Sequence, residues 1–115
     1  MIKCLFLGYD RKKTKLISLL EKNGCKVINL KRQLLTKDLK KNDIYISFGY
    51  RKIISKKILR SAKRPIINLH LSYLPFNRGA YPNFWSFVDN TQSGVTIHEI
   101  DKGIDTGPIL YQKKI

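Results

Sequence analysis

The stretch from Ile67 to Pro108 decides the fold of this chain. It reads Ile-Asn-Leu-His at 67–70, Ser-Tyr-Leu-Pro at 72–75, Asn-Arg-Gly-Ala at 77–80 and Asp-Lys-Gly-Ile-Asp-Thr-Gly-Pro at 101–108. Asn68 and His70 are two residues apart in an apolar run, so on a strand their side chains share one face. Because unpaired polar groups are costly to bury, two polar side chains on one face of a buried strand require an explanation. If the chain folds back, an amide, an imidazole and the carboxylate of Asp105 meet in one small pocket.

The residues before this stretch alternate between two patterns. Short apolar runs bounded by Gly, Asn and Asp predict buried strands, and runs with helical spacing between them predict helices. The predicted strands are Ile2–Gly8, Cys25–Leu30, Asp43–Gly49 and Pro65–Leu71, and the predicted helices are Leu16–Lys22, Leu34–Lys40 and Ile53–Ala62. Strands that alternate with helices predict an α/β fold with a Rossmann-like, mostly parallel sheet flanked by helices.

The last third of the chain has a different pattern. Pro82 is suited to the first turn of a helix that runs to Asn90. Strands are predicted at Gly94–Ile100 and Ile109–Ile115, and the loop between them allows antiparallel pairing. We therefore expect an antiparallel extension at the C-terminal end of the sheet.

Length and charge limit the possible domain organisation and function further. The 115 residues are expected to form a single domain, 1–115, with a net charge of +15. Residues 1–64 hold 19 Lys/Arg and 4 Asp/Glu, whereas residues 65–115 hold 4 of each. The basic front half is either a face that attracts nucleic acid or phosphate or a solvated Lys-rich surface. The second interpretation is favoured because Lys outnumbers Arg, the usual residue for bidentate recognition.

Several other classes of protein are excluded by what the sequence lacks. No apolar run approaches the ~18 residues of a membrane span, and the N-terminus lacks a signal peptide's leading charge. Cys4 and Cys25 do not have metal-type spacing and are expected to be reduced, buried, small apolar side chains in a cytoplasmic protein. There is no G-x-G-x-x-G and no phosphate-cradling G-x-x-x-x-G-K-[ST], which excludes nicotinamide and nucleoside-triphosphate chemistry.

The order and spacing of these residues resemble the 10-formyltetrahydrofolate-dependent formyltransferase family. That family includes methionyl-tRNA, glycinamide ribonucleotide and sugar-amine N-formyltransferases. Its signature is Asn-x-His at a strand end, a proline turn and an Asp before a Gly-rich turn, which match Asn68, His70 and Asp105. The resemblance extends from roughly Ser47 to Ile115. Against the family, the chain is short at the front and at the C-terminus, and the missing tail favours a homodimer.

The resemblance implies a role for each catalytic residue. Acyl transfer to an amine needs donors for the developing oxyanion and a group that relays protons. Asn68 would donate to the oxyanion, His70 would return a proton to the leaving nitrogen, and Asp105 would raise the pKa of His70 or accept the proton of the amine. No metal is implied.

The resemblance also implies binding residues. One loop would hold the folate through backbone groups, a second loop would contact it after the next strand, and further residues would hold the substrate. The expected folate-binding residues are Tyr50, Arg51, Lys52, Ile53, Ile54, Ile100, Asp101, Lys102, Gly103 and Ile104, and the expected substrate-binding residues are Ser72, Arg78, Gly79 and Asn83. Gly107 allows a close backbone approach. The pattern leaves open whether His98 faces the pocket or has a surface or pairing role.

The predicted function is therefore transfer of a formyl group from 10-formyltetrahydrofolate to a primary amine of a small molecule. Asn-Arg-Gly-Ala-Tyr-Pro-Asn-Phe-Trp-Ser at 77–86 is most similar to enzymes that formylate nucleotide-linked amino sugars, although those carry an Asp at the position of Tyr81. Two alternatives stay open. One is a methionyl-tRNA formyltransferase-like enzyme, which the basic front half favours. The other is a folate- or nucleotide-binding module without catalysis, which the short chain favours.

Overall fold

The computed structural model describes residues 1–71, 94–101 and 107–114. The chain divides into two compact units, Met1–Ile66 and Ile67–Ile115. The predicted helix from Pro82 to Asn90 lies outside the described residues.

The first unit is built around a buried parallel sheet. Strand β1 (Ile2–Gly8) pairs in parallel with β2 (Cys25–Leu30) on one side and with β3 (Ile44–Phe48) on the other. The run from Cys4 to Leu7 is fully buried. Burial on both faces is typical of the central strand of a parallel sheet, and it explains why the sequence is continuously apolar here rather than alternating.

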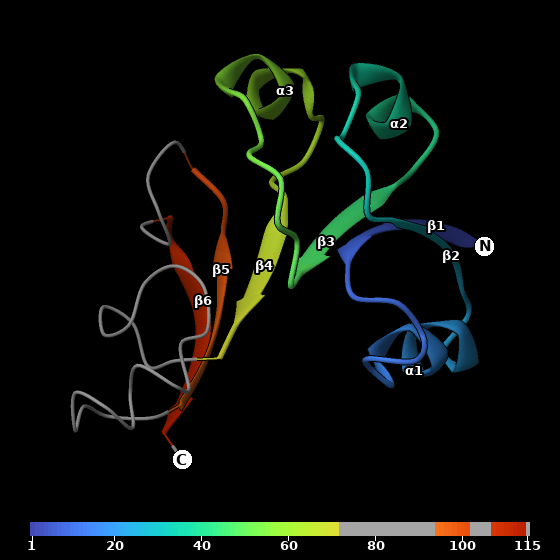
Figure 1. Ribbon diagram of the computed structural model, residues 1–115, viewed down its shortest axis with the longest axis vertical. Coiled ribbons are helices and arrows are strands. Elements are labelled where there is room, and N and C mark those ends of the chain that lie inside the picture. The colour runs from blue at the N-terminus through green and yellow to red at the C-terminus, as the bar shows by residue number, and fades with distance from the viewer. Residues whose placement is uncertain (72–93, 102–106, 115) are drawn as a thin grey trace. The chain divides into compact units, whose positions relative to one another are not determined.

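Helices cover both faces of these strands. Helix α1 (Leu16–Lys22) lies on one face, and α2 (Thr36–Lys40) and α3 (Lys56–Ser61) lie on the other (Figure 1). Gly24 follows α1 with a φ of 94°, a conformation that favours glycine, and the helix ends at Lys22 as predicted. The first unit therefore has the predicted α/β architecture.

Two predicted helices begin later than expected, because side chains cap them. Ser55 is extended, and its hydroxyl accepts a hydrogen bond from the backbone of Ile58, so α3 begins at Lys56 rather than at Ile53. The carboxylate of Asp38 accepts from the backbone N–H of Leu35, so α2 begins at Thr36 rather than at Leu34.

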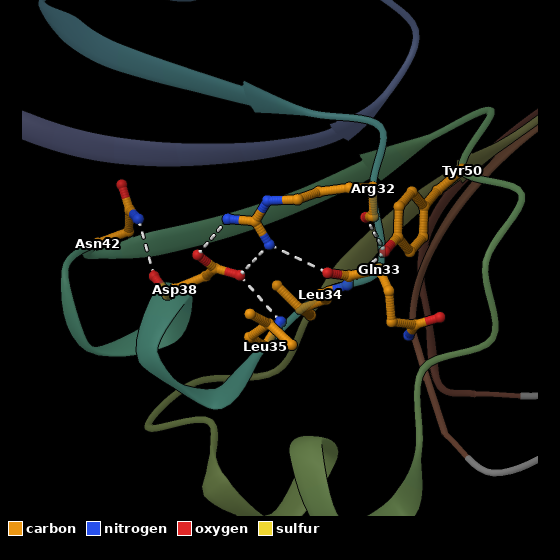
Figure 2. A network of polar contacts seen from close by, with 7 residues as sticks. All are labelled: Arg32, Gln33, Leu34, Leu35, Asp38, Asn42 and Tyr50. Atoms are coloured by element: carbon orange, nitrogen blue, oxygen red, sulfur yellow. Dashed lines mark hydrogen bonds and ion pairs between the residues drawn. The ribbon is translucent and has the colours of Figure 1, made fainter.

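A polar network holds the segment before α2 in place (Figure 2). Arg32 donates two hydrogen bonds, of 2.9 and 2.8 Å, to the two carboxylate oxygens of Asp38. The Asp38 side chain is buried, and the hydrogen bonds from Arg32 lower its pKa below the ordinary value. Asn42 donates to the backbone carbonyl of Asp38 over 2.9 Å. The network thus links the end of β2 to the whole length of α2.

The second unit is antiparallel. Strand β4 (Ile67–His70) pairs with β5 (Gly94–Glu99), and β5 pairs with β6 (Ile109–Lys114). The register between β5 and β6 shifts between Ile97 and His98. The predicted antiparallel extension is therefore confirmed. Along β5 every second residue is buried, which matches the alternation expected when one face of a sheet is covered.

Candidate active site

The pairing of β4 with β5 gathers polar side chains on one face of the second unit. Asn68 lies opposite His98, and His70 lies opposite Thr96. Residues directly opposite each other in an antiparallel pair point to the same face. Thr96 and His98 are almost fully buried, and His70 is 6% exposed. Asn68 and His70 therefore share one face, as the sequence predicted, and two residues of β5 join them.

His98 is hydrogen-bonded through both ring nitrogens. Its Nε2 lies 3.1 Å from Nδ2 of Asn68, and its Nδ1 lies 3.0 Å from the carbonyl oxygen of Glu99. The surface role that the sequence left open for His98 is excluded, because the residue is 1% exposed. The pairing role is present, because His98 is hydrogen-bonded to Asn68.

The other two polar residues of this face extend the arrangement. The rings of His70 and His98 have centroids 6.4 Å apart and are inclined by 75°. Thr96 accepts a hydrogen bond of 3.1 Å from Gln112 of β6. We call these residues the polar face, and its members are Asn68, His70, Thr96, His98 and Gln112.

Thr96 and Gln112 of the polar face were not among the predicted site residues, and the role of His98 was left open. The signal for Thr96 and His98 was present, because they alternate with Val95 and Ile97 on a strand predicted to lie near the site. Local sequence does not reveal the register of β5 against β4, which places these residues beside Asn68 and His70. Nothing in the sequence pointed to Gln112.

The end of β5 lies against the residues directly before β6. The backbone N–H of Glu99 donates to the carbonyl of Pro108 over 2.8 Å. A Cβ on Gly107 would lie 1.6 Å from the carbonyl oxygen of Glu99. Only a glycine fits at this distance, so the close approach predicted for Gly107 is present. Gly107 approaches the carbonyl oxygen of Glu99, which also lies within hydrogen-bond distance of Nδ1 of His98.

The predicted folate loop, residues 50–54, belongs to the first unit and begins where β3 ends. Gly49 precedes it with a φ of 70°, and the ring of Tyr9 lies so close that a Cβ on Gly49 would be 2.4 Å from it. In parallel α/β sheets ligands bind outside the carboxyl ends of the strands. The loop therefore starts at the end of the sheet where a ligand is expected.

Side chains fix the shape of this loop (Figure 2). The hydroxyl of Tyr50 donates to the carbonyl of Arg32 over 2.7 Å and accepts from the N–H of Leu34 over 2.8 Å. Gln33 donates to the carbonyl of Ile53 over 2.8 Å. The hydroxyl of Tyr50 is thus hydrogen-bonded within the protein. Such a loop can present backbone groups in a constant geometry.

Several predicted site residues lie outside the described residues, namely Ser72, Arg78, Gly79, Asn83, Lys102, Gly103, Ile104 and Asp105. Ile100 and Asp101 are described, directly after β5, and are half-buried. Of the three predicted catalytic residues, the structure brings Asn68 and His70 together.

Within the described ranges, no group of three or more His, Cys, Asp or Glu side chains is arranged to hold a metal ion. No helix there is both long and apolar enough to cross a membrane.

Two curated relatives are similar to part of the chain in sequence. The chain is 49% identical over 71 residues to methionyl-tRNA formyltransferase of Thermodesulfovibrio yellowstonii, which is 61% of this chain and 23% of that protein. It is 46% identical over 76 residues to the bifunctional polymyxin resistance protein ArnA of Wigglesworthia glossinidia brevipalpis, which is 65% of this chain and 12% of that one. The chain thus spans a quarter or less of the length of these curated relatives.

Solved structures are similar over almost the whole chain. The formyltransferase PseJ from Anoxybacillus kamchatkensis, in complex with UDP-4,6-dideoxy-4-formamido-L-AltNAc and tetrahydrofolate, matches with a TM-score of 0.86 and 45% identity, over 98% of this chain and 60% of that one. Phosphoribosylglycinamide formyltransferase from Bacillus halodurans shares the fold, with a TM-score of 0.80 at 22% identity, over 98% of this chain and 78% of that one.

The family model for formyl transferases matches residues 6–115. That match includes both units, the polar face and the loop that follows β3. Together with the arrangement of Asn68 and His70, it shows that the chain belongs to the formyl transferase family.

Proposed function

We propose that this protein transfers a formyl group from 10-formyltetrahydrofolate to the amine of a nucleotide-linked amino sugar. The observation that carries the proposal is the placement of Asn68 and His70 on one face of β4, next to buried polar partners on β5. The proposal is supported by the similarity to PseJ, whose structure contains a UDP-linked formamido sugar and tetrahydrofolate.

Each step of the reaction has a residue suited to it. The neutral amine attacks the formyl carbon, a C–N bond forms, and negative charge develops on the formyl oxygen. The side-chain N–H of Asn68 is suited to stabilise that charge. The amine then loses a proton, and Asp105 is proposed to accept it directly or through water. The bond to N10 of the folate breaks as His70 returns a proton to that nitrogen. The products are a formamide and tetrahydrofolate.

The proposed folate contacts follow the same reasoning. The backbone of residues 50–54 would hold the pterin, because Tyr50 and Gln33 keep that loop in one shape. The second folate segment, residues 100–104, and the substrate residues Ser72, Arg78, Gly79 and Asn83 are proposed on the family pattern. The cytoplasm is the proposed compartment. Both cysteines are free thiols, as is usual for proteins of a reducing compartment.

The direct test is turnover. Purified protein, 10-formyltetrahydrofolate and the UDP-linked 4-amino sugar that corresponds to the PseJ product are mixed, and tetrahydrofolate release is followed. Turnover is expected, and Asn68→Ala should reduce kcat by about 10²–10³-fold. Asn23→Ala is the matched control, since Asn23 is exposed at the end of α1. If there is no turnover and calorimetry detects no folate binding, the proposal is wrong.

A second candidate acceptor is methionyl-tRNA. It is favoured by the 49% identity to a methionyl-tRNA formyltransferase and by the 19 Lys/Arg among residues 1–64. Competition between the amino sugar and charged tRNA in one assay separates the two. A tRNA affinity that falls steeply with salt indicates phosphate contacts, because binding to phosphates releases counterions. Folate binding that is unchanged in Asn68→Ala and His70→Ala, without product from either amine, would instead indicate a binding module.

A further inference from the structure

The hydrogen bonds of His98 determine which of its nitrogens carries the proton. The carbonyl oxygen of Glu99, 3.0 Å from Nδ1, can only accept a hydrogen bond. Nδ1 must therefore carry the hydrogen. In a neutral imidazole the other nitrogen is then an acceptor. The Nε2 atom, 3.1 Å from Asn68, thus presents a lone pair to that side chain.

The lone pair on Nε2 of His98 determines the orientation of the side-chain amide of Asn68. Only the nitrogen end of an amide can donate, so Nδ2 must face His98 and Oδ1 must point away from it. Turning the amide over would place Oδ1 against the lone pair of Nε2, which is repulsive. One N–H of the amide is used by His98, and the same nitrogen carries a second N–H that can be directed at a substrate oxygen.

Burial makes this orientation specific. His98 is 1% exposed, so bulk water does not compete for its Nε2. Hydrogen bonds are electrostatically stronger in such surroundings than in water, and a wrongly turned amide is correspondingly costly. The cross-strand register that pairs Asn68 with His98 also holds their backbones opposite each other. The amide is therefore held both by its backbone and by its side-chain partner.

We propose that His98 is a positioning residue: it acts through Asn68, by holding the side-chain amide with its N–H donor directed at the formyl oxygen. This rests on the proposed formyl transfer. Stabilisation of an oxyanion depends on donors that are oriented before the charge appears. An amide free to rotate would have to be ordered during the reaction, and a misplacement of about 1 Å can cost about 10²-fold in rate.

The first experiment measures the proton position without reference to activity. Nitrogen-15 NMR of histidine-labelled protein, with His98 assigned by comparison with His98→Gln, distinguishes a protonated from an unprotonated ring nitrogen. We expect protonated Nδ1 and unprotonated Nε2 at neutral pH, and an Nε2 shift that changes in Asn68→Ala. A proton on Nε2, or a shift unaffected by removal of Asn68, overturns the proposal.

The second experiment uses two substitutions that keep opposite halves of the imidazole. His98→Gln places an amide oxygen near the position of Nε2 and so retains an acceptor for Asn68. His98→Asn retains a donor near the position of Nδ1 and removes that acceptor. We expect His98→Asn to lower kcat by about 10²-fold with KM for folate and for amine unchanged, and His98→Gln to recover most of that loss.

Other results contradict the inference. Equal losses in both variants, or losses that appear in KM, indicate that His98 acts only in packing. A wild-type protein with the expected tautomer but no formyl transfer supports the orientation of the amide and overturns the proposed function instead. Failure of either variant to fold is detected by circular dichroism, and the NMR result on the wild-type protein then decides.

Discussion

The hydroxyl of Tyr50 donates a hydrogen bond of 2.7 Å to the backbone carbonyl of Arg32. The same oxygen accepts from the backbone N–H of Leu34. One side chain therefore supplies both a donor and an acceptor to a segment that belongs to neither a helix nor a strand. Partial burial raises the pKa of Tyr50 above its ordinary value, so the hydroxyl keeps its proton at neutral pH.

Tyr50→Phe should destabilise the protein by about 0.5–1.5 kcal/mol, because a backbone donor and a backbone acceptor lose their partner in a partly exposed place. Urea unfolding measures the change. Tyr111→Phe is the control, since Tyr111 is 54% exposed on β6, and it should change stability by less than about 0.5 kcal/mol. If the loop binds folate as proposed, Tyr50→Phe should also raise the KM for folate more than it lowers kcat. Equal effects of the two substitutions would contradict this account.

The Arg32–Asp38 pair should make stability depend on acid pH. The hydrogen bond from Arg32 lowers the pKa of folded Asp38 below its unfolded value, which is about 3.9. The stabilisation is therefore present above that unfolded value and is lost as the pH falls through the lower folded value. Urea midpoints measured from pH 7 down to pH 3 should fall less steeply in Asp38→Asn than in the wild type.

Removing the partner gives the matched test of this pair. Arg32→Gln should reduce the pH dependence to a similar extent, and the double substitution should add little to either single one. Asp38→Asn alone should cost roughly 1–2 kcal/mol at pH 7, since Arg32 and Leu35 lose a charged acceptor. Additive effects of the two single substitutions would show that the pair is not coupled.

Gly107→Ala should harm both stability and activity. Its new Cβ would lie 1.6 Å from the carbonyl oxygen of Glu99, so the backbone must move, at a cost of roughly 1–3 kcal/mol. Gly24→Ala provides the comparison. Gly24 has a positive φ, but no atom lies within 4 Å of a Cβ there, so only strain of about 1–2 kcal/mol is expected. Activity should fall in Gly107→Ala alone, and unchanged kcat in that variant would contradict the expected effect.

The two cysteines should differ in reactivity. Cys4 is fully buried in β1, and burial raises the pKa of its thiol to about 11. The thiolate is the reactive form, so Cys25→Ser, which retains Cys4, should not react with Ellman's reagent at pH 8 until the protein is unfolded. Cys4→Ser, which retains the half-buried Cys25, should react in the native state. Rapid reaction of native Cys25→Ser would show that β1 opens readily.

Local sequence predicted much of the first unit. The bounds of β1, α1 and β2 match the predicted ranges, because each is marked by residues within it or directly beside it. Gly8 ends β1 and Gly24 follows α1, both with positive φ. The helices α2 and α3 were predicted, but the residues at which they begin were not. Those starts depend on capping by Asp38 and Ser55, which apolar spacing alone does not reveal.

The candidate site was likewise predictable from the sequence only in part. The alternation of side chains on a strand was enough to place Asn68 and His70 on one face, and the order of motifs was enough to indicate the family. The partner of Asn68 was not predictable from local sequence, because His98 is 30 residues away and is brought beside it only by the register of β4 against β5.

The sequence by itself determined the elements and placed the two proposed catalytic side chains of β4 on one face, because the periods of 2 and 3.6 residues and the turn residues act over a few positions. The tertiary structure alone decided what surrounds those side chains. Hydrogen bonds such as Asn68–His98 and Tyr50–Arg32 depend on strand register and loop shape. Both arise from the packing of segments far apart in the chain, so no local pattern encodes them.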